Sequence, residues 1–261
     1  MKKRIDVLIA ERELAKSREK AKTLIIAGEV RANGEAVKNP SDTFDEDVVI
    51  EIGKDACPYV SRGGLKLEKA IDKFKLSLKD KVCMDIGAST GGFTDCMLKN
   101  GAKYVYAVDV GYGQFDWALR NDARVKLMER TNARYIEMQE QPVDFVSVDV
   151  SFISLRLIFP AIARVTAQGA QVVTLIKPQF EAGREHVGKK GVVRDSAVHE
   201  EVIKKTIADA RANALFVRGI TYSPIKGPNG NIEYLAYFST ESAEDIPDVN
   251  GIVMSAHTQL L

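Results

Sequence analysis

The sequence predicts an α/β protein whose larger part is a doubly wound, mostly parallel, Rossmann-like sheet with an antiparallel last strand. From about Tyr59 onward, short apolar runs alternate with helical segments, as expected when helices on both faces connect parallel strands. The last two strand candidates have no helix between them, so the final strand should be antiparallel. The pattern before residue 53 differs and predicts a small separate α+β domain.

The strand candidates are apolar runs rich in Val, Ile, Tyr and Phe. They are Val82–Ile86, Tyr104–Val108, Val125–Met128, Phe145–Val148, Val172–Ile176, Leu215–Thr221 and Tyr234–Ser239. The helical segments that separate most of them are Phe93–Asn100, Phe115–Asn121, Leu155–Ala167 and Ser196–Asn213. The repeated strand-then-helix order is the basis for the parallel sheet.

The first fifty residues show helix and hairpin signals. Ser17 can cap a helix that continues to Ala27 and stops at Gly28. The pair Asn33-Gly34 then marks a tight hairpin turn. The segment that follows this domain carries turn residues without periodicity. We therefore predict an N-terminal domain, a linker and a main domain at residues 1–52, 53–58 and 59–261.

Composition narrows the class of protein. The chain has 261 residues with a formal net charge of +1, so any basic surface must be local. Its three cysteines have no short spacing, which favours a reducing compartment and a cytoplasmic location. Its three histidines form no metal-binding pattern, and no apolar stretch is long enough to span a membrane. We expect neither a metal site nor a membrane partner, and nothing indicates an oligomeric state.

A glycine-rich loop follows the first strand of the main domain. Glycines at such a turn let the backbone approach a ligand closely. The spacing differs from the dinucleotide fingerprint, and a leading carboxylate suits a cationic ligand better than a pyrophosphate. S-adenosylmethionine (AdoMet) carries both an ammonium and a sulfonium. The loop residues that we expect to bind it are Asp85, Gly87, Ala88, Ser89, Thr90, Gly91 and Gly92.

Further cofactor contacts are expected beside this loop. Asp109 ends the second strand and can accept both ribose hydroxyls of an adenosine, with Val110 beside it. Asn132 could contact the adenine edge, although it is explained equally well as an exposed residue of a loop. The alternative for the whole feature is a tight strand–helix turn followed by a capping aspartate.

Charged residues stand at the ends of later strands. Asp149 closes the fourth strand, and Lys177 closes the fifth just before Pro178. A charge directly after an apolar run must face a crevice or be buried at high cost. Glu233 begins the last strand, and Lys66 follows a pair of glycines upstream. Taken singly, each residue also has a purely structural explanation. Lys66 could be a solvated helix residue and Asp149 a helix cap. Lys177 and Glu233 could form a surface ion pair.

Together these residues resemble a family. The order Lys66, Asp149, Lys177, Glu233 is similar to the Lys-Asp-Lys-Glu tetrad of FtsJ-like ribose 2′-O-methyltransferases. Three segments resemble the TlyA branch in particular: Ser61–Leu67, Asp85–Thr94 and Ile176–Glu181. The resemblance covers nearly the whole chain, but Ser89-Thr90 stands where the wider family often carries a proline. It implies AdoMet-dependent methylation of ribosomal RNA, with cytidine ribose as the acceptor and one or both ribosomal subunits as targets.

The tetrad implies a direct displacement in which a ribose 2′-hydroxyl attacks the sulfonium methyl. Lys177 is our candidate base. A lysine accepts a proton only in its neutral form, which a nearby Lys66 ammonium and partial burial would favour. Asp149, which we also expect beside the cofactor, and Glu233 would orient the lysines and the hydroxyl. The sequence leaves open which of the two lysines takes the proton.

The N-terminal domain is similar to the small RNA-binding domain of ribosomal protein S4. It carries basic residues at the terminus and along its second helix, which could grip RNA phosphates. A solvated basic helix is the competing interpretation. The residues that we expect to bind RNA are Lys2, Lys3, Arg4, Lys16, Arg18, Lys20 and Lys22.

Three other functions compete with ribosomal RNA ribose methylation. The family is often labelled "hemolysin", which suggests a membrane-damaging protein, but no spanning or strongly amphipathic stretch supports this. A non-catalytic RNA-binding assembly factor would have little reason to keep all four tetrad residues. Methylation of a base rather than a ribose would fit the same fold, and the tetrad argues against it.

Overall fold

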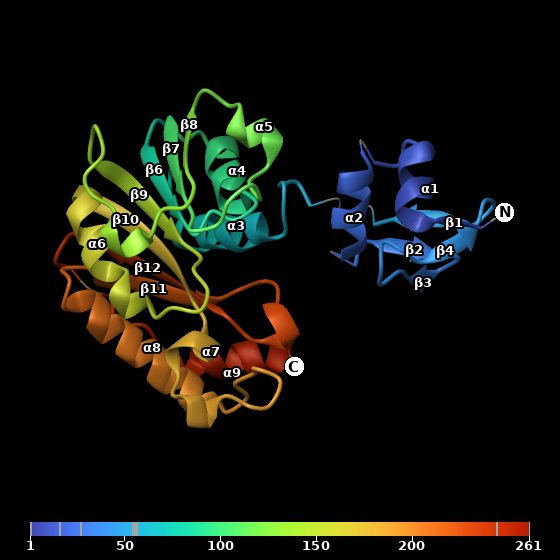
Figure 1. Cartoon of the computed structure of the whole chain (residues 1–261). Helices are drawn as coiled ribbons and strands as arrows, with labels where there is room; N and C mark the ends of the chain where they lie inside the picture. Colours follow the sequence, from blue (N-terminus) through green and yellow to red (C-terminus); the bar gives the residue numbers. More distant parts are fainter. Residues whose placement is uncertain (1, 16, 27, 54–56, 244, 261) are drawn as a thin grey trace. The chain divides into compact units, whose positions relative to one another are not determined.

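The computed structural model describes residues 2–15, 17–26, 28–53, 57–243 and 245–260, and the chain forms two compact units, Met1–Pro58 and Tyr59–Leu261 (Figure 1). Each unit has its own buried apolar cluster. The linker 53–58 stays a prediction, because residues 54–56 lie outside the described part of the chain.

The N-terminal unit packs two helices, α1 (Ile5–Glu11) and α2 (Arg18–Ile26), over short antiparallel strands. The predicted hairpin is confirmed: β2 (Val30–Ala32) pairs with β3 (Glu35–Ala36), and both turn residues have positive φ. Strand β5 (Ile50–Ile52) pairs with the other edge of β2. The basic terminus forms β1 (Lys2–Arg4), which pairs antiparallel with β4 (Thr43–Asp45).

The second unit contains a seven-stranded sheet in the order β11-β12-β10-β9-β6-β7-β8. Its five parallel neighbours are β6 (Val82–Ile86), β7 (Tyr104–Val108), β8 (Val125–Met128), β9 (Val143–Val148) and β10 (Thr166–Ile176). The last strand β12 (Tyr234–Ser239) is antiparallel to both β10 and β11 (Phe216–Tyr222), which confirms the predicted architecture. Strand order reverses between β6 and β9, the position at which doubly wound sheets bind ligands.

Helices cover the sheet on both sides (Figure 1). Helices α3 (Gly63–Phe74) and α4 (Gly92–Lys99) pack together, and the short α5 (Trp117–Arg120) follows β7. On the other side, α6 (Phe159–Val165), α8 (Ser196–Arg211) and α9 (Val249–Leu260) share an apolar core with the strands. The one-turn α7 (Pro178–Glu181) follows β10.

The helix predictions need four corrections. The segment Phe115–Asn121 is helical only over the four residues of α5, Trp117–Arg120, because the Asp116 side chain caps the helix there. The segment Leu155–Ala167 is a 3₁₀ turn plus α6, and it ends at Val165 because β10 begins at Thr166. Helix α3 was not among the predicted helices, because two glycines begin it. Helix α9 lies in a tail from which we predicted nothing, although Val249, Val253 and Ala256 recur at helical spacing and are buried.

Candidate active site

A cavity of about 520 Å³ lies at the carboxyl ends of β6, β7 and β9. The predicted cofactor residues that line it are Gly87, Ser89, Asp109, Val110, Asn132 and Asp149. The structure places the other predicted residues away from its wall: Asp85, Ala88, Thr90, Gly91 and Gly92. The cavity is therefore lined by residues at the ends of three strands, β9, β6 and β7, which are neighbours in the sheet at its switch point.

Two glycines of the loop are required by its shape. Gly87 has a φ of +86°, and a Cβ atom there would overlap the carbonyl oxygen of Asp149. Gly91 has a φ of +95° and precedes the first residue of α4, where a Cβ atom would crowd the Leu119 side chain. The loop can thus pass directly beside the end of β9 only because Gly87 carries no side chain, and it can pass beside Leu119 only because Gly91 carries none.

Asp85 lies beneath the loop rather than on the cavity wall. Its carboxylate is fully buried and accepts hydrogen bonds from Thr94 Oγ1 at 2.7 Å and Ser147 Oγ at 3.1 Å. Burial raises the pKa of Asp85 to about 7. In this position the carboxylate ties β6 to α4 and β9, so its contact with a cofactor stays a prediction that the geometry does not favour.

Asp109 is held with its carboxylate at the cavity. It accepts hydrogen bonds from the backbone N–H groups of Ser89 at 2.7 Å and Gly111 at 2.6 Å. The amide of Gln114, which also lines the cavity, donates to it at 3.2 Å. Asn132 also lines the cavity, while its side-chain oxygen caps a 3₁₀ turn by accepting from Arg134 N.

The four predicted catalytic residues meet in one cluster. Lys66, on α3, lies 2.7 Å from Glu233 and 3.9 Å from Asp149. Lys177, at the end of β10, lies 2.6 Å from Asp149, so this carboxylate stands between the two lysines. Asp149 also lines the cavity and therefore joins the cluster to the predicted cofactor site.

Burial makes this charge cluster unusual. Glu233 is fully buried, and each lysine is 8% exposed. Two lysines face two carboxylates, and this pairing of opposite charges lowers the cost of holding Lys66, Lys177 and Glu233 away from water. Such a cluster is more constrained than a surface ion pair and can hold side chains in a fixed geometry.

Sequence reasoning missed several partners of this cluster. Ser151 Oγ accepts a hydrogen bond from Lys177 Nζ at 2.9 Å, and Gln179 donates to Glu233 at 3.4 Å. Phe152 lines the cavity with 90% of its surface exposed and a φ of +62°. Their place in the sequence was the available signal. Ser151 and Phe152 come just after Asp149, and Gln179 comes just after Lys177, so all three follow strand ends that carry predicted catalytic residues.

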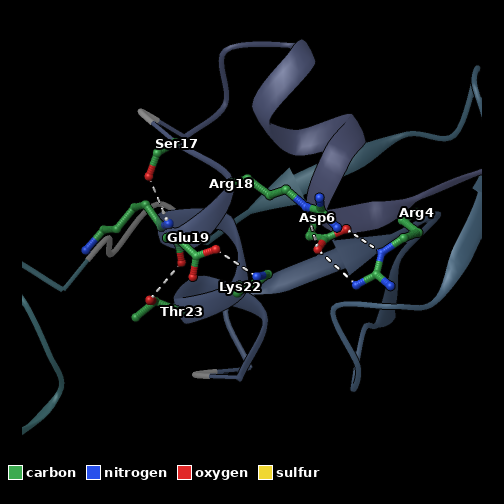
Figure 2. A network of polar contacts seen from close by, with 8 residues as sticks. Arg4, Asp6, Ser17, Arg18, Glu19, Lys22 and Thr23 are labelled. Carbon is green, nitrogen blue, oxygen red and sulfur yellow. Dashed lines mark hydrogen bonds and ion pairs between the residues drawn. The ribbon is translucent and has the colours of Figure 1, made fainter. Parts of the chain in front are cut away.

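Most of the predicted RNA-binding cations of the first unit have acidic partners. Figure 2 shows the partners of Arg4, Arg18 and Lys22. The buried carboxylate of Asp6 accepts hydrogen bonds from Arg4 at 3.0 Å and from Arg18 at 3.0 Å. The guanidinium of Arg4, chiefly, and that of Arg18 lower the pKa of Asp6. These two arginines thus also anchor the helix pair, in addition to any contact with RNA.

The remaining cations of that set differ in their surroundings. Lys3 pairs with Glu11 at 3.0 Å, and Lys22 pairs with Glu19 at 2.7 Å. Lys2 and Lys20 are exposed, and Lys16 lies outside the described residues. RNA binding by all seven stays a prediction.

Neither a metal-binding cluster nor a membrane-spanning helix occurs in the described part of the chain. Among the described residues, no group of three or more His, Cys, Asp or Glu side chains could hold a metal ion. Within the same part of the chain, no helix combines the length and apolar character needed to cross a membrane.

The sheet order, the antiparallel β12 and the cavity at the switch point define a Rossmann-like enzyme of the methyltransferase type. The chain belongs to the FtsJ-like methyltransferase family, whose profile matches residues 59–240. An S4 domain matches residues 3–50. The resemblance inferred from the tetrad and the loop is thereby confirmed at the level of the family.

Individual relatives cover most of the chain. A Bacillus subtilis protein, YqxC, is 48% identical over 99% of this chain and 95% of its own length. The 16S/23S rRNA (cytidine-2'-O)-methyltransferase TlyA of Mycobacterium tuberculosis is 40% identical over 92% of this chain and 90% of its own. A solved structure from Streptococcus thermophilus is 48% identical and has a TM-score of 0.80, covering 99% of this chain and 96% of that chain.

Proposed function

We propose that this enzyme transfers the methyl group of AdoMet to a ribose 2′-hydroxyl of ribosomal RNA, with cytidine as the acceptor nucleoside. The observation that carries the proposal is the convergence of Lys66, Asp149, Lys177 and Glu233 in one cluster, whose member Asp149 also lines the cavity. A hydroxyl acceptor needs a base and fixed positioning groups, and this cluster provides both kinds of side chain.

The residues of the cavity fit an adenosine-containing cofactor. Gly87 permits close backbone approach, and the Asp109 carboxylate is directed to the cavity by two backbone N–H groups. AdoMet would supply an electrophilic methyl group on a sulfonium. In this assignment Asp109 binds the ribose hydroxyls, and Asn132 and Val110 lie beside the adenine.

The chain's own part in the reaction is to orient the acceptor and remove its proton. The 2′-oxygen forms a bond to the methyl carbon while the bond from carbon to sulfur breaks, and the hydroxyl proton passes to the base. We assign the base to Lys177, which contacts two residues that line the cavity, Asp149 at 2.6 Å and Ser151 at 2.9 Å. Lys66 and Glu233 hold Asp149 and the acceptor in place.

The first unit and the relatives support ribosomal RNA as the substrate class. An S4 domain binds structured RNA, and the TlyA relative is named for both ribosomal RNAs. We assign ribosomal RNA, in one or both ribosomal subunits, as the partner, which places the work of the protein in the cytoplasm. Among the predicted RNA-binding cations that the structure describes, the exposed Lys2 and Lys20 have no acidic partner within 4.0 Å, which leaves them available to phosphates.

The decisive experiment maps 2′-O-methyl groups by mass spectrometry on ribosomal RNA from cells with and without this protein. A methylated cytidine that disappears with the protein supports the proposal, and unchanged RNA overturns it. Purified protein should transfer labelled methyl groups from AdoMet to ribosomal RNA or subunits. Deleting residues 1–51 should weaken RNA binding while sparing AdoMet affinity. Purified protein should cause no leakage from liposomes, since leakage would favour the hemolysin interpretation.

A further inference from the structure

A second cavity, of about 220 Å³, lies near the tetrad and outside the cofactor site. It is formed by the segment between α7 and α8, by the loop before β12 and by α9, which Figure 1 shows close together. Arg194 comes from the first of these, Lys226 from the second and His257 from the third. Three stretches far apart in sequence therefore build one small polar cavity.

The charge around this cavity is positive although the chain as a whole is near neutral. Residues 184–195 contain four lysines and arginines against two carboxylates, and Lys226 adds to the excess. Arg194 and Lys226 are both exposed, and no carboxylate of the described residues lies within 4.0 Å of either. Arg4 and Arg18 of the first unit, by contrast, both pair with Asp6.

The two cations stand on segments that are fastened to each other. Asn231 donates to the Gly191 carbonyl at 2.9 Å and accepts from Val193 N at 3.3 Å. Asn229 donates to the Lys190 carbonyl at 3.1 Å. These hydrogen bonds fix the spacing of the segments that carry Arg194 and Lys226, so a ligand would meet a preformed site.

The same loop packs against the catalytic cluster. A Cβ atom on Gly227 would overlap the Glu233 carboxylate, and Ile232, the neighbour of Glu233, lines the cavity. Gly227 also follows Lys226 directly. A ligand in this cavity is therefore placed beside the tetrad by the backbone itself.

The third member contributes a hydrogen-bonding group rather than a charge. The His257 imidazole meets Nδ1 of the buried His199 at 3.1 Å. Burial lowers the pKa of His257, which keeps it neutral near pH 7. The positive character of the cavity thus comes from Arg194 and Lys226.

We propose that this cavity binds a backbone phosphate of the RNA next to the nucleotide that is methylated, with Arg194 and Lys226 as its ligands. Arginine matches phosphate with its planar fork and lysine supplies a point charge. The inference rests on the proposed function, because it takes the substrate to be RNA whose ribose lies at the tetrad. It adds a phosphate contact on the methyltransferase domain, separate from the S4 domain.

The test compares the full-length double variant Arg194→Ala/Lys226→Ala with the wild type in RNA binding and methyl transfer. Losing the contact with one phosphate should reduce the magnitude of the slope of log K against log salt by about 0.7 to 0.9. The KM for ribosomal RNA should rise about tenfold or more, with kcat at saturating RNA and AdoMet affinity unchanged. Arg194→Lys should keep most of the binding, since it keeps the charge.

The matched control is Lys79→Ala/Lys103→Ala. It removes two exposed cations that lie just before β6 and β7, at the ends of these strands opposite to the cofactor cavity. Equal salt slopes and equal KM values for the two double variants would overturn the phosphate site. Failure of the proposed function looks different, because the wild type itself would then transfer no methyl group to ribosomal RNA. A thermal melt of each variant checks that the fold is retained.

Discussion

Lys66 Nζ lies 2.7 Å from Glu233 Oε2, and both side chains are almost completely removed from solvent. The pair joins residues that are 167 positions apart in sequence, linking α3 to the start of β12. Buried ion pairs are costly to assemble and costly to break, so this pair is better explained by a need for fixed geometry than by stability. That need is what the proposed reaction requires of the tetrad.

Glu233→Gln should therefore destabilise the methyltransferase domain by about 3 kcal/mol, because it leaves the Lys66 charge buried with only Asp149 nearby. Urea unfolding of the full chain measures this. The double variant Lys66→Met/Glu233→Gln should recover much of the stability without recovering methyl transfer. Glu241→Gln, at the exposed Arg218 pair, is the control and should change stability by less than about 0.5 kcal/mol.

Lys177→Ala should keep AdoMet binding and lose methyl transfer by about 10²-fold or more, because the proposed base is removed while the residues that line the cofactor cavity are kept. Lys177→Arg should be as inactive, since an arginine keeps the charge but does not give up its proton. Calorimetry with AdoMet and transfer of labelled methyl groups to RNA separate the two effects. Lys204→Ala, on the surface of α8, should be fully active. Normal transfer by either Lys177 variant would remove this residue from the role of base.

The sequence indicated the strands well, because apolar runs between turn residues locate them without tertiary information. Strands β6, β7, β8 and β12 begin and end at the predicted residues. The loop between β6 and α4 was predicted as a ligand site, but the buried position of Asp85 beneath this loop was not predicted. Its partner Ser147 lies opposite it in the register of β6 and β9, and register cannot be read from either strand alone.

Contacts between side chains on different helices and strands were also not predicted from the sequence. The interpretation of Arg4 and Arg18 as RNA-binding or solvated basic residues did not include Asp6, because only the packing of α1 against α2 brings these charges together. The four residues of the tetrad were predicted from the resemblance to FtsJ-like methyltransferases. The distances that place Asp149 between two lysines could come only from the fold.

Gly87→Ala should destabilise the domain by about 3 kcal/mol and weaken AdoMet binding, because the new methyl group overlaps the Asp149 carbonyl in a left-handed backbone. Gly113→Ala is the matched control: its φ is +76°, but nothing lies within 4 Å of the added atom. It should cost about 1 kcal/mol and leave AdoMet affinity almost unchanged. Equal losses in the two variants would show that backbone strain, and not the close approach to β9, dictates the glycine.

His199 should make the stability of the domain depend on pH. The imidazole is fully buried, with Nδ1 2.7 Å from Tyr234 Oη and Nε2 3.0 Å from the Val193 carbonyl, and burial lowers its pKa to about 4. Because the folded pKa lies below the unfolded value of about 6.5, the contribution is complete above that value and is lost as pH falls towards 4. The loss should reach about 2 to 3 kcal/mol at pH 4.

Comparing His199→Gln with the wild type isolates this contribution. Asp85, with its raised pKa of about 7, acts in the opposite direction, since its effect is lost as pH rises, but it is the same in both proteins. The wild type should therefore lose its stability advantage over His199→Gln between pH 6.5 and 4 in urea unfolding. His186→Gln, at an exposed histidine, should follow the wild type at every pH. If His199→Gln and the wild type instead lose stability in parallel, His199 is not the group that titrates.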